Sequence, residues 1–152
     1  MLLETKRLLL REMNPEDYDA LFRVLGDPET MWHYPYTFDG KHVRDWIERN
    51  MKRYRKDGFG LWAVCLKDTG EMIGDCGLTM QIINGDIRPE IGYHIRRDMQ
   101  RKGYAKEAAI AAAPDLIKAA EEKLEELENR MQMAGQLSEV TEDHGEESAE
   151  IE

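Results

Sequence analysis

The chain has 152 residues, enough for one domain with a hydrophobic core and too few for two ordinary domains. Apolar residues make up 41% and charged residues 34%, and no apolar run approaches the roughly 18 residues that a membrane-spanning helix needs. The charged N-terminus does not resemble a secretory signal, so we expect a cytoplasmic protein without a membrane partner. Only Cys65 and Cys76 are present, which excludes a disulfide scaffold and a four-cysteine zinc site. We expect both thiols to be reduced core residues, and no metal.

The negative charge lies entirely in the C-terminal part of the chain. Residues 1–113 hold 18 basic and 18 acidic side chains, whereas residues 114–152 hold 3 basic and 13 acidic ones. Every aromatic residue lies at or before Tyr104, and aromatic side chains dominate core burial, so the core is predicted within the first ~110 residues. An acidic tail repels phosphate backbones and a neutral body attracts them little, so nucleic acid is not an expected partner.

The first third of the chain predicts a strand followed by two helices. A short apolar run favours a strand within Glu4–Met13. Asn14 followed by Pro15 and two acids is typical of a helix start, and Gly26 ends that helix. Helical spacing of apolar residues predicts a second helix over about Lys41–Lys56. Its basic residues are expected to form a solvated face: Arg49, Lys52, Arg53, Arg55 and Lys56.

A meander of three strands and a long helix follow. The strands are predicted over Gly60–Leu66, Glu71–Ile83 and Pro89–Ile95, and an Asn-Gly pair marks the hairpin between the last two. Beyond them, apolar residues recur at alternating intervals of three and four from Ile110 to Ala134, which predicts an amphipathic helix.

Two residues within or after the heptad pattern predict breaks in that helix. Pro114 is expected to kink or restart it, and Gly135 to end it. Residues 136–152 are acidic and nearly free of apolar side chains, so we expect them to be disordered. The apolar stripe over residues 110–134 offers a surface for a homo-oligomer.

Gln100–Ala105 connects a strand to a helix and carries the clearest chemical motif. Free backbone N–H groups and the positive end of a helix dipole meet at such a junction, which suits a pyrophosphate. Gly103 permits close approach of phosphate oxygens, and the small Ala105 keeps the next turn open. Four nearby residues add positive charge: Arg96, Arg97, Arg101 and Lys102. By itself the motif also fits a simple turn with solvated basic residues.

The order of these elements resembles the GNAT superfamily of N-acetyltransferases over residues 2–110. The segments ETKRLLLREMNPEDYDALF, MWHYPYTF and EIGYHIRRDMQRKGYAKEA are most similar to the ribosomal-protein N-terminal acetyltransferase group. The resemblance implies an α+β fold with a mixed, mainly antiparallel sheet flanked by helices, incomplete at the C-terminal side, and an added long C-terminal helix. The family's fifth strand, its helix with a proton-donating tyrosine and its closing strands have no visible counterpart in the sequence.

Three segments are therefore expected: a GNAT-like acetyl-CoA-binding domain over residues 1–110, an amphipathic heptad-patterned helix over 111–135, and an acidic disordered tail over 136–152. The resemblance implies transfer of an acetyl group from acetyl-CoA, the co-substrate, to a primary amine of a small molecule or a protein N-terminus. A non-catalytic, truncated or rearranged acyl-CoA-binding remnant is a second reading. An interaction protein that uses the helix over 110–134 is a third.

The resemblance also assigns candidate site residues. The pyrophosphate would lie on Gln100, Arg101, Lys102, Gly103, Tyr104 and Ala105, and the pantetheine arm along Tyr93, His94 and Ile95. The acceptor pocket would be lined by Trp32, Tyr34 and Tyr36. Strand alternation puts Glu90 and His94 on one face, where either could accept the proton of the amine. A solvated glutamate and a locally satisfied histidine are the alternatives for these two residues.

Overall fold

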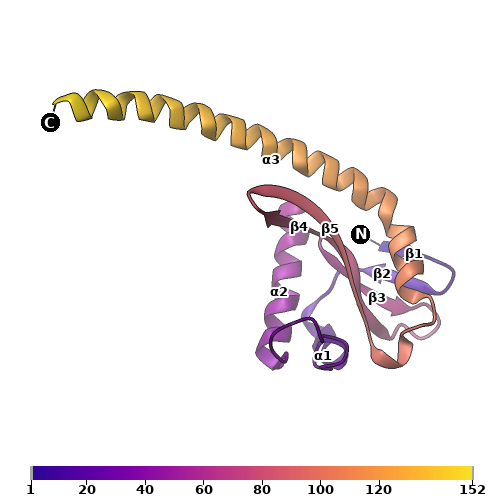
Figure 1. The fold of residues 1–152 in the computed structure, drawn as a ribbon. Helices are drawn as coiled ribbons and strands as arrows, with labels where there is room; N and C mark the ends of the chain where they lie inside the picture. Colours follow the sequence, from indigo (N-terminus) through magenta and orange to yellow (C-terminus); the bar gives the residue numbers. More distant parts are fainter. Residues whose placement is uncertain (1, 152) are drawn as a thin grey trace. The chain divides into compact units, whose positions relative to one another are not determined.

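The structure, a computed structural model, describes the backbone of residues 2–151 and the side chains of residues 3–80 and 84–135 (Figure 1). Five strands form one sheet whose spatial order follows the chain, and every neighbouring pair is antiparallel. The strands β1 to β5 span Leu2–Glu4, Leu8–Arg11, Leu61–Leu66, Met72–Ile83 and Asp86–Ile95. This arrangement agrees with the mainly antiparallel sheet, flanked by helices, that the sequence predicts.

The strand predicted within Glu4–Met13 is β2, and the chain reverses at Thr5 after an additional short strand, β1. The Thr5 hydroxyl accepts a hydrogen bond from the Leu8 N–H at 2.9 Å, and the Thr5 N–H donates to the Leu8 carbonyl at 2.9 Å. These bonds close a turn between β1 and β2, which then pair with each other. The predicted start at Glu4 is too early, because residues 5–7 form the turn between the two strands.

The first two helices begin at capping residues. A 3-10 turn, η1 (Pro15–Asp17), leads into α1 (Tyr18–Leu25), and the Asn14 side chain accepts a hydrogen bond from the Glu16 N–H at 2.9 Å. The helix α2 (Gly40–Asp57) follows a capping aspartate and ends at a glycine in the left-handed region. Both helices lie where the local sequence signals predict them.

The hairpin between β4 and β5 is also confirmed. Ile83 faces Asp86 across a two-residue turn, and both turn residues, Asn84 and Gly85, have positive φ, at 51° and 81°. This is the backbone geometry that an Asn-Gly pair favours in a tight hairpin. The hairpin extends β5 upstream of Pro89, where the strand was expected to begin.

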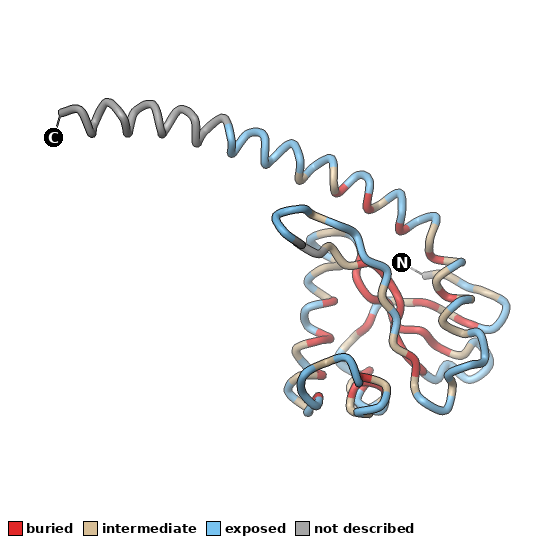
Figure 2. The backbone as a smooth tube through the Cα atoms, in the orientation of Figure 1, coloured by how far each residue is buried: buried red, intermediate tan, exposed pale blue. Residues whose placement is uncertain are grey.

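The main core lies between one face of the sheet and the helices α1 and α2. Figure 2 shows buried positions on the strands and on the turns of α2. The buried members of this core are Met13, Leu21, Val24, Leu25, Met31, Phe38, Val43, Trp46, Ile47, Leu61, Ala63, Cys65 and Met72. Their packing fixes α2 against the strands that carry the candidate site.

Both cysteines are buried, free thiols within this sheet. Burial raises the pKa of Cys76 to about 12 and also raises the pKa of Cys65 above its ordinary value. A thiol with a raised pKa and no access to solvent is a poor nucleophile. The structure therefore agrees with their interpretation as core residues.

The helix α3 spans Tyr104–Ile151 and continues through Pro114, so the restart expected there is wrong. The missing N–H of Pro114 leaves the Ile110 carbonyl without its helical donor, but Pro114 and Ile110 are both exposed and water can hydrate that carbonyl. The backbone is also helical through Gly135, where an end was expected, since one exposed glycine costs a helix only about 1 kcal/mol.

The chain divides within α3 into two units, residues 1–119 and 120–152. The candidate site lies in the first unit. The side chains of residues 136–152 lie outside those described, so the expectation for that segment stays a prediction. Within the described residues, no helix combines the length and the apolar character needed to cross a membrane.

Candidate functional site

A short loop joins β5 to α3, and its shape depends on a glutamine and two left-handed residues. The Gln100 Nε2 donates to the Ile95 carbonyl at 2.8 Å and reaches the Thr30 hydroxyl at 3.3 Å. Arg101 and Gly103 have φ values of 60° and 83°, in the region that favours glycine. The loop backbone therefore curls tightly and is held at its start by the Gln100 side chain.

The first turn of α3 presents backbone N–H groups without helical acceptors. The Glu107 N–H donates to the Gly103 carbonyl at 3.0 Å, which closes the first turn. The N–H groups of Tyr104, Ala105 and Lys106 precede that bond and have no acceptor within the helix. They coincide with the positive end of the helix dipole, so this turn can bind an anion such as a pyrophosphate.

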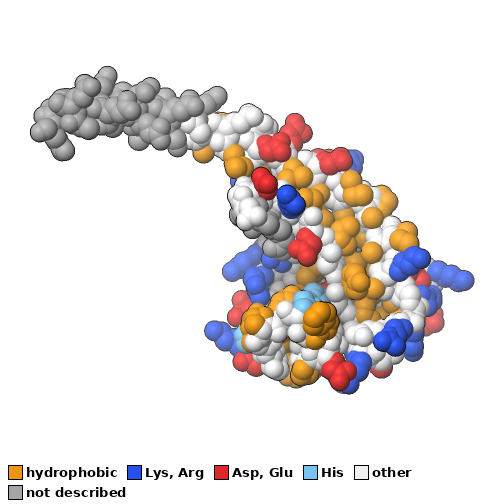
Figure 3. Space-filling view, in the orientation of Figure 1, with side chains coloured by type: hydrophobic (Ala, Val, Ile, Leu, Met, Phe, Trp, Pro, Cys, Tyr) orange, Lys and Arg blue, Asp and Glu red, His pale blue; other side chains and the backbone are white. Residues whose placement is uncertain are grey.

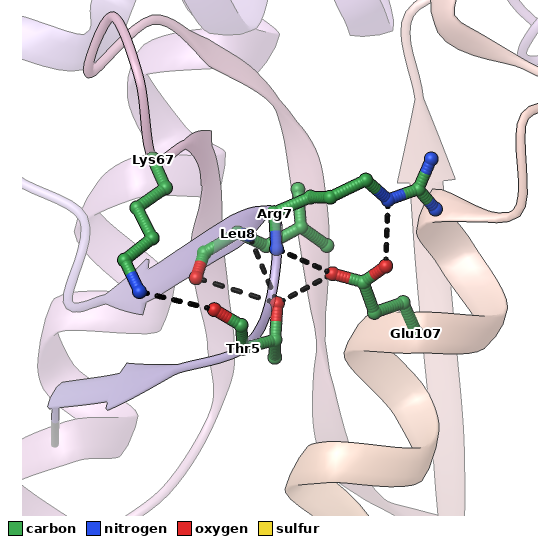
Figure 4. Close-up of polar contacts among 5 residues, drawn as sticks. All are labelled: Thr5, Arg7, Leu8, Lys67 and Glu107. Carbon is green, nitrogen blue, oxygen red and sulfur yellow. Dashed lines mark hydrogen bonds and ion pairs between the residues drawn. The ribbon is translucent and has the colours of Figure 1, made fainter.

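The start of α3 is fastened to the β1–β2 hairpin by Glu107, as Figure 4 shows. Its Oε2 accepts from the Thr5 hydroxyl at 2.5 Å and from the Arg7 N–H at 3.0 Å, and its Oε1 accepts from the Arg7 Nε at 2.7 Å. Burial raises the pKa of Glu107, but the hydrogen bonds from Thr5 and Arg7 lower it more. The Arg7 guanidinium also lies over the Tyr104 ring, 4.3 Å from its centroid.

The strand β5 has one edge free of any described strand. The Arg96 N–H donates to the Ile73 carbonyl at 2.8 Å, and the β4–β5 register continues without a shift. Alternate residues therefore point their backbone groups away from β4, and Pro89, Tyr93 and Ile95 are among them. An extended ligand can pair with the outward N–H and C=O groups of Tyr93 as an added strand would.

The loop, the start of α3 and the end of β5 surround one cleft of about 670 Å³. Its lining includes eight of the predicted cofactor residues: Tyr93, His94, Ile95, Gln100, Arg101, Gly103, Tyr104 and Ala105. The ninth, Lys102, is exposed and is not part of the lining. Trp32, predicted in the acceptor pocket, lines this cleft instead and is 79% exposed.

A second cleft of about 530 Å³ adjoins the first. Tyr34 and Tyr36, predicted to line the acceptor pocket, and the candidate base Glu90 line it. The two clefts share three lining residues: His33, Tyr93 and His94. The structure thus brings the predicted cofactor and acceptor residues together, with His94 on the walls of both clefts.

The His94 side chain is held by a buried carboxylate on the neighbouring strand. Its Nδ1 lies 2.8 Å from the Oδ1 of Asp75, which is fully buried, and the Trp46 Nε1 donates to the other oxygen of Asp75 at 3.0 Å. Burial lowers the pKa of His94, but the charge of Asp75 and its hydrogen bond together raise it above its ordinary value.

Aromatic rings surround the imidazole. The ring centroids of Trp46, His33 and Tyr34 lie 5.3, 6.2 and 6.3 Å from that of His94. Burial raises the pKa of Tyr34, and the negative charges of Asp75 and Glu90 act in the same direction. These contacts limit rotation of the His94 ring at the junction of the clefts.

Asp75 is a candidate site residue that the sequence analysis missed. The signal for it is an acid inside the segment MIGDCGL, where glycine and apolar residues predict a buried strand. A buried acid needs partners, and those partners come from α2 and β5, which are distant in sequence. Among the residues whose side chains the structure describes, no group of three histidines, cysteines or acids could hold a metal ion.

Comparison with known proteins gives related sequences over most of the chain. The family model described as Acetyltransferase (GNAT) domain matches residues 7–140, beyond residue 110, where the resemblance was expected to end. Uncharacterized protein YkkB of Bacillus subtilis (strain 168) is 38% identical over 110 residues, which are 72% of this chain and 64% of that protein. Uncharacterized N-acetyltransferase p20 of Bacillus licheniformis is 37% identical over 109 residues, which are 70% and 60% of the two chains.

A solved structure has the same fold. The acetyltransferase from Agrobacterium tumefaciens str. C58 is 26% identical, with a TM-score of 0.62 over 82% of this chain and 69% of that one. The chain spans less than two thirds of the length of the two curated relatives. The family match, the relatives and the fold agree with one another, and the chain belongs to the GNAT family of acetyltransferases.

Proposed function

We propose that this chain transfers an acetyl group from acetyl-CoA to a primary amine by direct attack of the amine. The observation that carries the proposal is the junction of two clefts at His94, whose Nδ1 is held by the buried Asp75. One cleft combines an anion site with a free strand edge, and the other has the predicted acceptor residues on its wall. Family membership supports the reaction class.

The residues of the first cleft fit acetyl-CoA. The backbone N–H groups of Tyr104, Ala105 and Lys106 would hold the pyrophosphate, and the left-handed Gly103 lets that backbone approach it closely. The outward backbone of Tyr93 would pair with the pantetheine arm. When bound, acetyl-CoA supplies an activated acyl carbon and a thiolate leaving group.

His94 is the proposed base. Because its Nδ1 faces Asp75, the proton on that nitrogen points to the carboxylate and Nε2 is left to accept a proton. In the net reaction a bond forms between the amine nitrogen and the acyl carbon, the carbon–sulfur bond breaks, and one proton passes from nitrogen to sulfur. His94 lines both clefts, so it can carry that proton. Glu90 is the second candidate base, because it lines the acceptor cleft.

Calorimetric titration of the 152-residue chain with acetyl-CoA is the first test of the proposal. Saturable binding in the micromolar range, about −8 kcal/mol, is expected. Thiol release with a panel of primary amines, including peptide N-termini as the resemblance to the ribosomal-protein group suggests, then tests turnover. Binding without release of thiol would support the non-catalytic acyl-CoA-binding remnant, and a folded sample that does not bind would contradict the proposal.

Exposed apolar residues favour a second candidate function, self-association through α3. Ile110, Ile117 and Met131 follow one heptad position and are 63%, 53% and 55% exposed. We expect a mass that rises with concentration in analytical ultracentrifugation, and Leu124→Glu with Leu127→Glu should abolish that rise. A wild-type protein that stays monomeric at every concentration would contradict this second function.

A further inference from the structure

The acceptor cleft carries two arginines that the proposed transfer does not use. Arg49 and Arg53 are one helical turn apart on α2, and both line the cleft of about 530 Å³ together with Trp46 and Asn50. The sequence predicted a solvated face for the basic run that contains them: Arg49 is exposed, as predicted, and Arg53 is half-buried. Figure 3 shows Lys and Arg side chains on the side of the molecule where α2 lies.

Packing places both arginine side chains. A Cβ at Gly60 would lie only 3.3 Å from the Arg53 Cβ, so α2 closely approaches the residue that precedes β3. The Arg49 Cζ lies 5.9 Å from the centroid of the Trp46 ring, a cation–π distance. Asn50 is buried and uses its amide internally, donating to the Trp46 carbonyl and accepting from a β3 backbone N–H, each at 2.9 Å. The arginines therefore provide the donors on the α2 wall of the cleft.

The two guanidinium groups form no ion pair with any described carboxylate. Burial and the like charge of Arg49 lower the pKa of Arg53, and the negative charge of Asp57 acts in the opposite direction. Guanidinium groups bind carboxylates through paired, charge-assisted hydrogen bonds, so two of them on one cleft wall favour an anionic ligand. Glu90 lines the same cleft from β5 and provides a negative charge that attracts an ammonium group.

We propose that Arg49 and Arg53 form an anion subsite of the acceptor cleft, and that the preferred acceptor is an amine that also carries a carboxylate. This inference rests on the proposed acetyl transfer, because it names the substrate class of that site. A carboxylate bound at α2 leaves the amine of the same molecule free to lie near His94, which lines the same cleft. Neutral amines of the same size have no carboxylate, so they cannot form the charge-assisted hydrogen bonds to the arginines.

The test uses matched pairs of acceptors that differ in one carboxylate: γ-aminobutyrate with its carboxamide, and alanyl-glutamate amide with alanyl-glutamine amide. The wild-type kcat/KM with acetyl-CoA is expected to be about tenfold or more higher for the acid in at least one pair. Arg49→Ala and Arg53→Ala should each reduce the rate for the acid toward that for the carboxamide, and the loss should be larger for the acid than for the carboxamide. Arg55→Ala removes an exposed arginine of the same helix outside the cleft lining, so it should keep the preference.

Equal kcat/KM values within both pairs, or equal losses for acid and carboxamide in the arginine variants, would overturn the subsite. Calorimetric titration with each acceptor alone gives a readout that needs no turnover. The acid is expected to bind more tightly than its carboxamide, and Arg49→Ala to remove the difference. If no acceptor is acetylated but this difference in binding remains, the acetyl transfer fails and the subsite stands. If acceptors are acetylated without discrimination, the subsite alone fails.

Discussion

The Nδ1 of His94 lies 2.8 Å from the Oδ1 of Asp75, on the strand that pairs directly with its own. The side chain of Asp75 is fully buried, and its second oxygen accepts the Trp46 N–H. Because both of its oxygens are bonded, the carboxylate holds the imidazole ring with Nδ1 facing the acid. The two ring nitrogens of His94 are therefore not equivalent. The other nitrogen, Nε2, is then the group whose protonation state decides whether His94 can act as a base.

Asp75→Asn should move the pH dependence of the reaction. Burial lowers the pKa of His94, and Asp75 raises it above the ordinary value of 6.5, so wild-type kcat/KM should rise with pH through a value above 6.5. Without the negative charge of Asp75, burial dominates the pKa of His94. The rise of kcat/KM should then shift to lower pH, and kcat should fall about tenfold or more. The pH profile of kcat/KM measures this. An unchanged profile would show that His94 is not the base.

His94→Gln and Glu90→Gln should separate the two candidate bases. Loss of a positioned base reduces kcat by about a hundredfold or more, so His94→Gln should cause that reduction and leave the affinity for acetyl-CoA nearly unchanged. Glu90→Gln should mainly raise the KM of the amine, since Glu90 lines only the acceptor cleft. Steady-state kinetics with both substrates varied checks the assignment, and the reverse pattern would give the role of base to Glu90.

Gly103→Glu should abolish acetyl-CoA binding without unfolding the domain. The new side chain adds bulk and a negative charge beside the proposed pyrophosphate site, and a residue other than glycine at a φ of 83° costs about 1 to 2 kcal/mol. Gly85→Glu is the matched control, because Gly85 has a φ of 81° in the β4–β5 turn, outside the first cleft. Calorimetric titration measures both variants. Unchanged affinity in Gly103→Glu would show that the loop does not hold the pyrophosphate.

Glu107→Gln should destabilise the fold in a pH-dependent manner. The variant weakens the charge-assisted hydrogen bonds to Thr5 and Arg7 and is expected to lower the free energy of unfolding at pH 7 by about 2 kcal/mol. The folded-state pKa of Glu107 lies below its ordinary value of 4.5, so this stability is present above pH 4.5 and is lost as the pH falls through the folded pKa.

Urea unfolding of wild type and Glu107→Gln at several pH values measures that difference. The exposed Glu121 on the same helix supplies the control, because Glu121→Gln should leave the stability nearly unchanged. A difference between wild type and Glu107→Gln that persists at strongly acidic pH would contradict an electrostatic origin.

Local signals account for the parts of the fold that the sequence predicts well. The capping side chain of Asn14, the Asn-Gly turn and the connector at Gln100 act within a few residues, so their consequences can be read along the chain. The turn at Thr5 was not predicted, because the apolar run of β2 is the stronger sequence pattern. At Pro114 the local rule predicted a kink or a restart, and the helix does not restart, because the affected carbonyl is exposed and exposure depends on how the helix packs.

The parts of the site that sequence reasoning missed depend on distant pairings. Asp75 becomes a partner of His94 only through the β4–β5 register, which aligns the two residues. The basic run of α2 is uniform in sequence, and only the packing of that helix against β3 selects Arg49 and Arg53 for the cleft. The first pairing follows from the two-residue Asn-Gly hairpin once the register is counted from that turn, whereas the second depends on packing between elements distant in sequence.

Pro89 has a further consequence for the free edge of β5. An unpaired strand edge is a template on which other chains can add and aggregate. Proline has no N–H to offer an incoming strand, so the outward position of Pro89 interrupts such pairing near the hairpin end. The same edge keeps its donors and acceptors at Tyr93, within the first cleft. β5 is therefore open to a short extended molecule at one end and protected from polymerisation at the other.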